Sequence, residues 1–141
     1  MTFFKSSDCS ALPTHLAEDV PFYLLQRGQI QAWNKWISQR NFPQMSNTAD
    51  LRGDRHREAN LRGAYLFNID LNGADLSRAN LRGAYLFNAN LREANLSRTN
   101  LRGADLSYAD LSGADLSEAN LSRTNLRGAG LDGVIVESAF W

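Results

Sequence analysis

The sequence predicts an all-β solenoid in which each coil has four short sides. Leucine stands at every fifth position from 51 to 131, with His56 as the one exception. In thirteen of these seventeen units Ala stands two residues before the centre, and in thirteen Asp or Asn stands one residue before it. Residues 59–68 recur unchanged twenty residues later, at 79–88. Since twenty residues hold four units of five, four units complete one coil.

The five-residue spacing favours extended backbone over helix. On an α-helix, five residues advance about 500°, so the leucines would point in all directions. In an extended chain, Ala and Leu two residues apart share one face, and the Asp or Asn between them points away. The remaining two residues turn the corner, and eight of the seventeen units end in Gly, which suits a turn. About four coils should therefore stack at strand spacing, about 4.8 Å.

This tract, from about Ala49 to Gly133, resembles the pentapeptide-repeat family, whose motif is Ala-(Asp/Asn)-Leu-x-x. The resemblance implies a right-handed quadrilateral β-helix with the central residue and the residue two before it inside. The hand of the coil follows from this resemblance alone.

Residues 1–48 are predicted to be a leader that contains a helical cap. Residues 21–40 have apolar side chains at helical spacing, with Pro21 suited to the first turn and Pro43 beyond the end. An open solenoid end needs a cover, and the residues expected to supply it are Leu25, Trp33, Trp36 and Ile37. A binding role for the two tryptophans is the alternative. The segment also resembles a leader that precedes pentapeptide repeats in cyanobacterial proteins.

Residues 134–141 depart from the motif at the other end. Val134, Ile135, Val136, Phe140 and Trp141 are bulkier than the side chains the repeat uses. We expect Val136, Phe140 and Trp141 to close the last coil. The alternative is that they form a homodimer contact, because open solenoid ends are natural surfaces for self-association.

Composition and charge exclude several classes of protein. The chain has 141 residues, 15 basic and 15 acidic side chains and a formal net charge of zero, which argues against direct nucleic acid binding. No apolar run approaches the 18 or more residues of a membrane span, and the start lacks the pattern of a signal peptide. Cys9 is the single cysteine, so an internal disulfide is excluded. A cytoplasmic protein without membrane association is expected.

The sequence shows no constellation that predicts catalysis. It has no phosphate-binding loop, dinucleotide fingerprint or metal-ligand spacing. His56 replaces an inward Leu and lies near Asp54, a pair that could orient an imidazole or bind a metal. However, terminal repeats are commonly irregular, so we interpret this pair as a frayed first turn under the cap. No catalytic, cofactor-binding or metal-binding residue is predicted, and the protein is not expected to be an enzyme.

The outward positions carry the remaining signals. Asn60, Asn80, Asn100 and Asn120 fall in register and are expected to hydrogen-bond to one another along the rod. Seven other outward residues form the predicted interaction surface, unless the leader covers the aromatic ones: Arg62, Tyr65, Phe67, Arg82, Tyr85, Phe87 and Arg102.

Two functional hypotheses follow. The first is a non-catalytic scaffold that binds an unknown protein partner. The alternative, implied by the resemblance, is a DNA mimic that binds DNA gyrase or a topoisomerase. Residues 49–133 hold eleven acidic side chains and eleven arginines, and a rod without net negative charge is a poor mimic of DNA.

Overall fold

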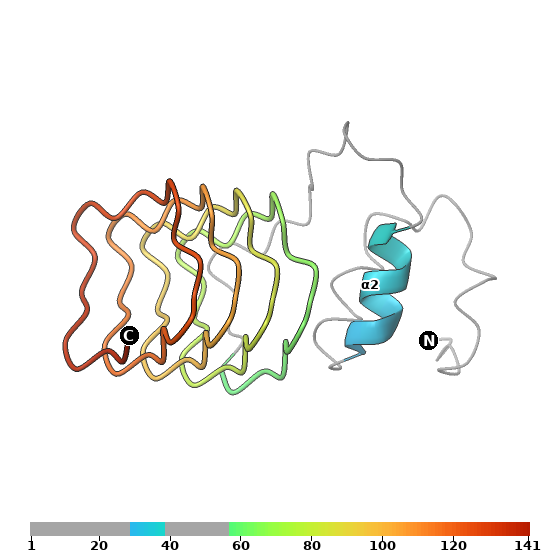
Figure 1. The fold of residues 1–141 in the computed structure, drawn as a ribbon, viewed down its shortest axis with the longest axis horizontal. Coiled ribbons are helices and arrows are strands. Elements are labelled where there is room, and N and C mark those ends of the chain that lie inside the picture. The colour runs from blue at the N-terminus through green and yellow to red at the C-terminus, as the bar shows by residue number, and fades with distance from the viewer. Residues whose placement is uncertain (1–28, 39–56) are drawn as a thin grey trace, which may run out of the picture.

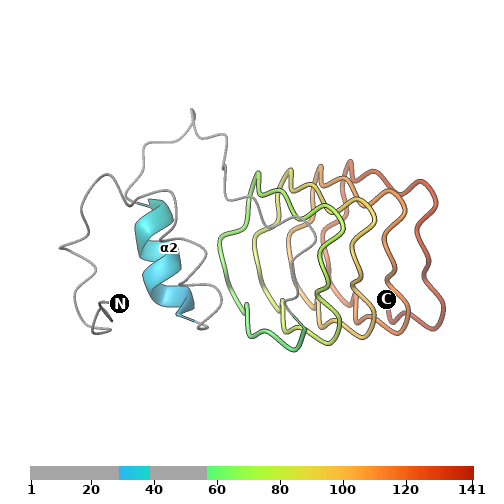
Figure 2. The same ribbon diagram turned by 180° about the vertical axis from the view of Figure 1, so that it is seen from behind.

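In the computed structural model, residues 29–38 and 57–141 are described, and residues 57–141 wind into a four-sided β-helix (Figure 1). Each side pairs with the side twenty residues later through a single parallel β-bridge, beginning with Asn60 to Asn80 and Tyr65 to Tyr85. The coil of twenty residues predicted from the sequence is thereby confirmed. Figure 2 shows the same stack of coils from behind, with helix α2 beside the first of them.

The corners follow one backbone rule. The second residue after each central Leu has a positive φ, between 54° and 72°, whether it is Gly or a larger residue such as Arg78 or Glu118. In most corners the N–H two residues before the next centre donates to the carbonyl of the preceding central Leu, as from Ala84 to Leu81 at 3.0 Å. A positive φ at the third residue of such a turn is the mark of a type II turn, which explains why Gly is frequent at this position.

The core consists of the two inward positions of each unit. Leu86, Leu96 and Leu101 are fully buried, and so is nearly every Ala two residues before a centre from Ala64 to Ala119. Thr99 replaces one of these alanines and stays buried because its hydroxyl donates to the carbonyl of Leu76 at 2.9 Å. The predicted assignment of inward and outward positions is confirmed.

The Asp or Asn before each Leu serves a local purpose, and the predicted Asn ladder is wrong. The Oδ1 atoms of Asn60, Asn80 and Asn100 each accept from the backbone N–H two residues later, at 3.1–3.4 Å. These amides act within their own corners, as in an Asx turn, and among the described residues no hydrogen bond joins one of them to another. Within residues 57–141, inter-coil bonds from Asn side chains occur on other sides, as from Asn90 to Asp70 at 3.1 Å.

Helix α2 spans Ile30–Ser38 and lies against the first described coil. It is the described part of the helix predicted over residues 21–40. Nothing in the described ranges is a helix of the length and hydropathy that a membrane span requires.

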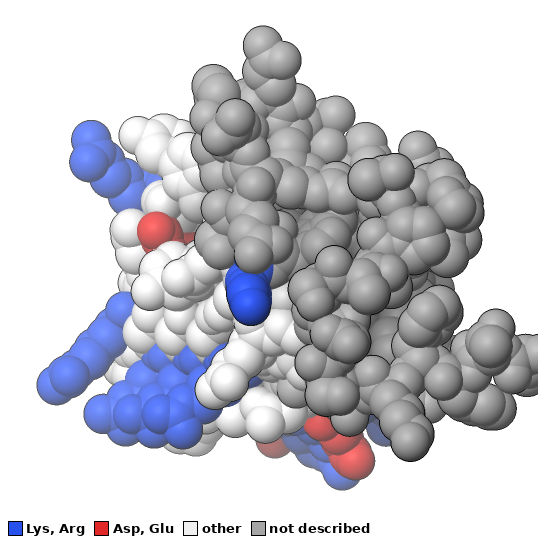
Figure 3. Space-filling model, turned by 90° about the vertical axis from the view of Figure 1, so that its right-hand side faces the viewer, with Lys and Arg blue, Asp and Glu red and all other residues white. Residues whose placement is uncertain are grey.

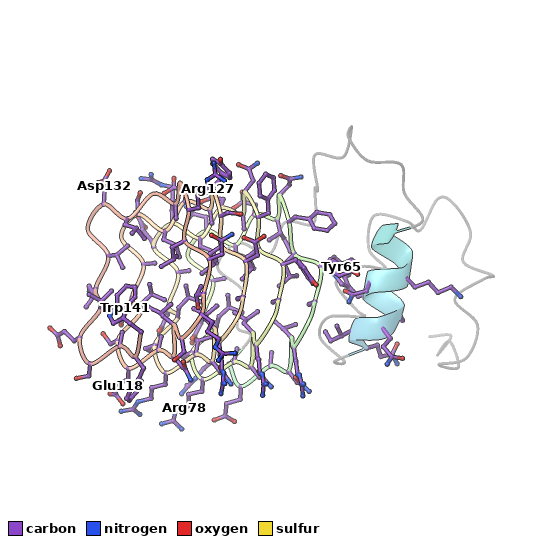
Figure 4. The ribbon with its side chains drawn as sticks, viewed as in Figure 1. Tyr65, Arg78, Glu118, Arg127, Asp132 and Trp141 are labelled. Carbon is purple, nitrogen blue, oxygen red and sulfur yellow. The ribbon has the colours of Figure 1, made fainter. Side chains whose placement is uncertain are left out.

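The last coil extends beyond the predicted boundary at Gly133. Ile135 pairs with Asp115, and Phe140 pairs with Asn120, so residues 134–141 continue the coil. Val136 is 41% exposed, Phe140 63% and Trp141 70%. Trp141 lies at the end of the rod opposite α2 (Figure 4).

Candidate protein-interaction surface

Five aromatic side chains in neighbouring coils, here called the aromatic surface, form two groups of ring contacts: Tyr65 with Phe67 and Tyr85, and Phe87 with Tyr108. The rings of Tyr65 and Tyr85 meet edge to face, with centroids 5.1 Å apart. Those of Phe87 and Tyr108 meet in the same way at 5.7 Å. Edge-to-face pairs are a favoured aromatic geometry, so the patch is ordered by contacts between successive coils.

Exposure divides the aromatic surface into two parts. Tyr65 and Phe67, in the first described coil, are partly buried and pack against the core. Tyr85 is 48% exposed, Phe87 44% and Tyr108 51%. The part that a partner could contact is therefore the part farther from α2.

Tyr108 is a member that the sequence pattern did not reveal. It stands at the second corner position, whereas Phe87 stands at the first, so the two residues lack the twenty-residue spacing that reveals Tyr65 and Tyr85. A Cβ on Gly128, directly beyond Tyr108, would lie 2.8 Å from the Tyr108 ring. The absent side chain at Gly128 thus leaves room for the orientation in which Tyr108 meets Phe87.

Arg62, Arg82 and Arg102 occupy the same corner of three successive coils, and together they are called the arginine row. All three are exposed. None forms an ion pair with a described residue, and stacking places them about 4.8 Å apart. This corner adjoins the side that carries Tyr65 and Tyr85, so the arginine row borders the aromatic surface. Figure 3, which looks from the end next to α2, shows basic side chains gathered along the outer corners of the coils.

Several other arginines on the rod pair with carboxylates. Arg98 donates to Glu118 through Nε and Nη2, at 3.0 and 3.1 Å. These hydrogen bonds, and then the charge of Arg98, lower the pKa of Glu118. The pKa of Asp110 is also lowered, first by hydrogen bonds from the Ser112 hydroxyl and backbone N–H and then by Arg92, whose Nη1 lies 3.2 Å away. Both shifts have structural causes, so neither indicates a catalytic acid.

At the other end of the aromatic surface, side chains of α2 form hydrogen bonds with the first described coil. The inner coils show the pattern that these bonds replace: the Tyr85 N–H donates to the carbonyl of Ala64, in the preceding coil, at 2.9 Å. Asn34 takes the equivalent place for Tyr65: its Oδ1 accepts from the Tyr65 N–H, and its Nδ2 donates to the Gly63 carbonyl, both at 2.8 Å. The Tyr65 carbonyl accepts from Trp33 Nε1 at 2.6 Å.

The structure describes the predicted cap residues to different extents. Trp33 is fully buried and belongs to the core cluster. Trp36 and Ile37 lie on α2, but their side chains are outside the described part, as is Leu25. The Asp54–His56 pair also falls outside the described residues. Among the residues that are described, no group of three or more His, Cys, Asp or Glu could hold a metal ion.

Several solved structures are similar to this chain. One is a pentapeptide repeat protein from the thylakoid lumen of Arabidopsis thaliana, at 28% identity, covering 72% of this chain and 73% of that chain with a TM-score of 0.63. A pentapeptide repeat protein from the cyanobacterium Nostoc is 49% identical over 57% of this chain and 62% of its own, with a TM-score of 0.34. QnrB1, a plasmid-mediated fluoroquinolone resistance protein, is 18% identical over 62% and 60%, with a TM-score of 0.30. No curated protein sequence matches the chain.

The model of the family of pentapeptide repeats matches residues 59–98, 84–123 and 94–133, which together cover more than half of the chain. The twenty-residue coil, the buried Ala and Leu positions and the four turning corners are the structural counterpart of that match. The chain belongs to the pentapeptide-repeat family and has its fold, the right-handed quadrilateral β-helix.

Proposed function

We propose that this protein is a non-catalytic, cytoplasmic scaffold that binds a protein partner through the aromatic surface and the arginine row. The observation that carries the proposal is the exposure of the outward residues Tyr85, Phe87 and Tyr108. Later coils have Asp, Asn, Ser or Arg in the places of Tyr85 and Phe87, and the other coils have Asn or Gly in the place of Tyr108. The repeat does not require aromatic rings at these sites, since Ser107 occupies the place of Phe87 one coil later.

The chemistry of these residues favours a partner with an apolar centre and an acidic border. Aromatic residues and Arg are enriched among the side chains that dominate binding at protein interfaces. The arginine row has no acidic partner among the described residues, so a carboxylate on another protein can pair with it. The rod holds these groups in fixed register because every coil is bonded to the next.

The surface charge disfavours the DNA-mimic alternative. A mimic of duplex DNA presents negative charge along its length, whereas this rod has the arginine row along one corner. Its carboxylates are partly neutralised as well, because Glu118 and Asp110 pair with Arg98 and Arg92.

The proposal includes a capping role for α2. Asn34 and Trp33 supply a side-chain acceptor and a side-chain donor where another coil would supply a carbonyl and an N–H. An uncovered coil edge is a template for unwanted strand pairing, and these bonds cover it at Tyr65.

The test is affinity purification from lysate of the source organism, comparing the wild-type protein with a Tyr85→Ser, Phe87→Ser variant. The variant should lose the specific partner, while its circular dichroism and melting temperature stay close to wild type. Binding that remains should weaken as salt is added, because salt screens the arginines.

Arg78→Ser is the matched control, since this exposed residue lies at the corner diagonally opposite Phe87 and should retain the partner. A double variant that melts far lower but keeps the partner would show that the rings serve packing alone. In a gyrase supercoiling assay with a quinolone we expect no protection, and protection would favour the alternative function.

A further inference from the structure

The arginine row runs parallel to the axis of the β-helix, because each coil is bonded directly to the next at this corner. The Gly63 N–H donates to the Arg82 carbonyl, and the Gly83 N–H donates to the Arg102 carbonyl, both at 3.0 Å. Successive arginines of the row are therefore attached one strand spacing apart, about 4.8 Å, and the three of them span about 10 Å.

The exposed part of the aromatic surface has two limits along the same axis. Towards the first described coil it ends where α2 bonds to Tyr65. In the other direction the row of Tyr65 and Tyr85 ends at Asp105, whose Oδ1 accepts from the Ser107 hydroxyl at 2.6 Å. Each of the three exposed rings lies in a coil that has described coils on both sides. Their exposure is therefore a property of the inner coils.

The two borders of the aromatic surface differ in charge. One border is the arginine row, whose three side chains are exposed and have no ion pair with a described residue. The other border has amides and a carboxylate: Asn88 Nδ2 donates to Asn68 Oδ1 at 2.8 Å, and Asn90 Nδ2 donates to Asp70 Oδ1 at 3.1 Å. A molecule that complements both borders has an apolar stripe with acidic side chains along one edge of it.

The spacing of the arginine row favours an α-helix over an extended peptide as that molecule. Along a β-strand, side chains on one face recur every two residues, so three of them span about 14 Å. Along an α-helix, side chains at i, i+3 and i+7 share one face and lie at heights of about 0, 4.5 and 10.5 Å. The arginines are attached at about 0, 4.8 and 9.6 Å. A helix parallel to the rod therefore matches each height to within about 1 Å, whereas a strand drifts by about 4 Å.

We propose that the aromatic surface and the arginine row bind an acidic amphipathic α-helix of a partner protein, which lies parallel to the rod axis. Its apolar stripe packs on the three exposed rings, and carboxylates one turn apart pair with the arginine row. The inference rests on the proposed function, because it specifies the partner of that same surface. Helix α2 does not match this description, since it has no acidic side chain and carries Lys35.

The test compares the binding of two synthetic peptides to the 141-residue protein by fluorescence anisotropy. Both peptides have the same content of Glu, Leu and Ala. The helical peptide has Glu at i, i+3 and i+7 and Leu at i+1, i+4 and i+8, and a hydrocarbon staple on its opposite face holds it helical. In the second peptide Glu and Leu alternate, as suits an extended chain. The helical peptide should bind at least about tenfold more tightly, because only its charges follow the arginine row.

A charge exchange tests the pairing with the arginines. Arg82→Glu with Arg102→Glu should lose the helical peptide and should bind a version of it in which Lys replaces every Glu. Added salt should weaken both complexes. Arg78→Glu with Arg92→Glu is the matched control, because it makes the same charge change at exposed positions of other corners and should bind the helical peptide as wild type does. Circular dichroism verifies that each variant is folded.

Several outcomes would overturn the proposal: no binding of the helical peptide, equal binding of the two peptides, or unchanged binding in the Arg82→Glu, Arg102→Glu variant. Tighter binding of an oligothymidylate of about twelve nucleotides would also overturn it, because aromatic and basic side chains together bind single-stranded nucleic acid. If the peptides fail but the Tyr85→Ser, Phe87→Ser variant loses its lysate partner, the proposed function stands and the helix is wrong. Retention of that partner would instead overturn the proposed function.

Discussion

The first and the last described coils of the β-helix differ in how far they are covered. At the N-terminal end, Trp33 is fully buried, and α2 bonds to the Tyr65 N–H and carbonyl. At the C-terminal end, Leu131 is 45% exposed, and the last coil's N–H donors at the centres have no described acceptor. Within the described residues, one edge of the repeat is therefore covered by α2, and the other has no described neighbour.

The largest effect that would test this contrast is expected from Trp33→Ala. The variant removes a fully buried indole and leaves the Tyr65 carbonyl without its donor, so unfolding should become easier by about 3–5 kcal/mol. Urea denaturation measures it. Gln31→Ala, at an exposed position of α2, is the control and should cost about 0.5 kcal/mol or less. Equal midpoints for the two variants would show that α2 does not cap the coil.

A second comparison places the same substitution in an inner coil and in the last one. Leu91 and Leu131 are central residues on the same side of the rod, but Leu91 is fully buried. Leu91→Ala should cost about 2–5 kcal/mol, and Leu131→Ala about 1 kcal/mol, because water already reaches part of its side chain. Both are measured by urea denaturation. Similar costs would mean that Leu131 is as well covered as Leu91.

Asn34 sharpens the contrast at the level of hydrogen bonds. Asn34→Leu keeps a similar volume but leaves the Tyr65 N–H and the Gly63 carbonyl without their partners, at an expected cost of about 1–3 kcal/mol. Asn34→Asp retains the acceptor and loses the donor, so it should fall between wild type and Asn34→Leu near neutral pH. Amide hydrogen exchange at Tyr65 is the direct measurement. Unchanged protection at Tyr65 in Asn34→Leu would contradict the edge-covering role.

The smallest effect concerns the paired charges of the inner coils. The pKa of Glu118 is lower in the folded protein than its ordinary value of 4.5, because Arg98 hydrogen-bonds to it. Its stabilising contribution is therefore present above that ordinary value and is lost as pH falls through the lowered folded pKa. The melting temperatures of wild type and Glu118→Gln should differ slightly near neutral pH and converge in acid. If the difference in melting temperature persisted at low pH, its cause would be something other than this ion pair.

The local period of the sequence was sufficient to predict the coil. Alternation of inward and outward residues requires no distant contact, so the Leu and Ala spacing predicted the buried set, and the twenty-residue repeat predicted which sides stack. The hand of the coil came from the family resemblance. The Asn ladder was predicted wrongly because the period places the amides in register but does not decide their partners: Asn80 accepts at its own corner, whereas Asn90 also donates to the neighbouring coil.

Only the tertiary structure decided the contacts between residues that are not related by the repeat. The bonds of Asn34 to Gly63 and Tyr65 join residues 29 and 31 positions apart, and α2 lies outside the repeat. Tyr108 joins the aromatic surface from a different corner position than Phe87, which no period reveals. Whether Tyr85 is covered or exposed likewise depended on where α2 docks. The sequence by itself determined the coil because the coil is built from local turns and one translation, whereas its ends and its surface depend on packing between segments that obey no common repeat.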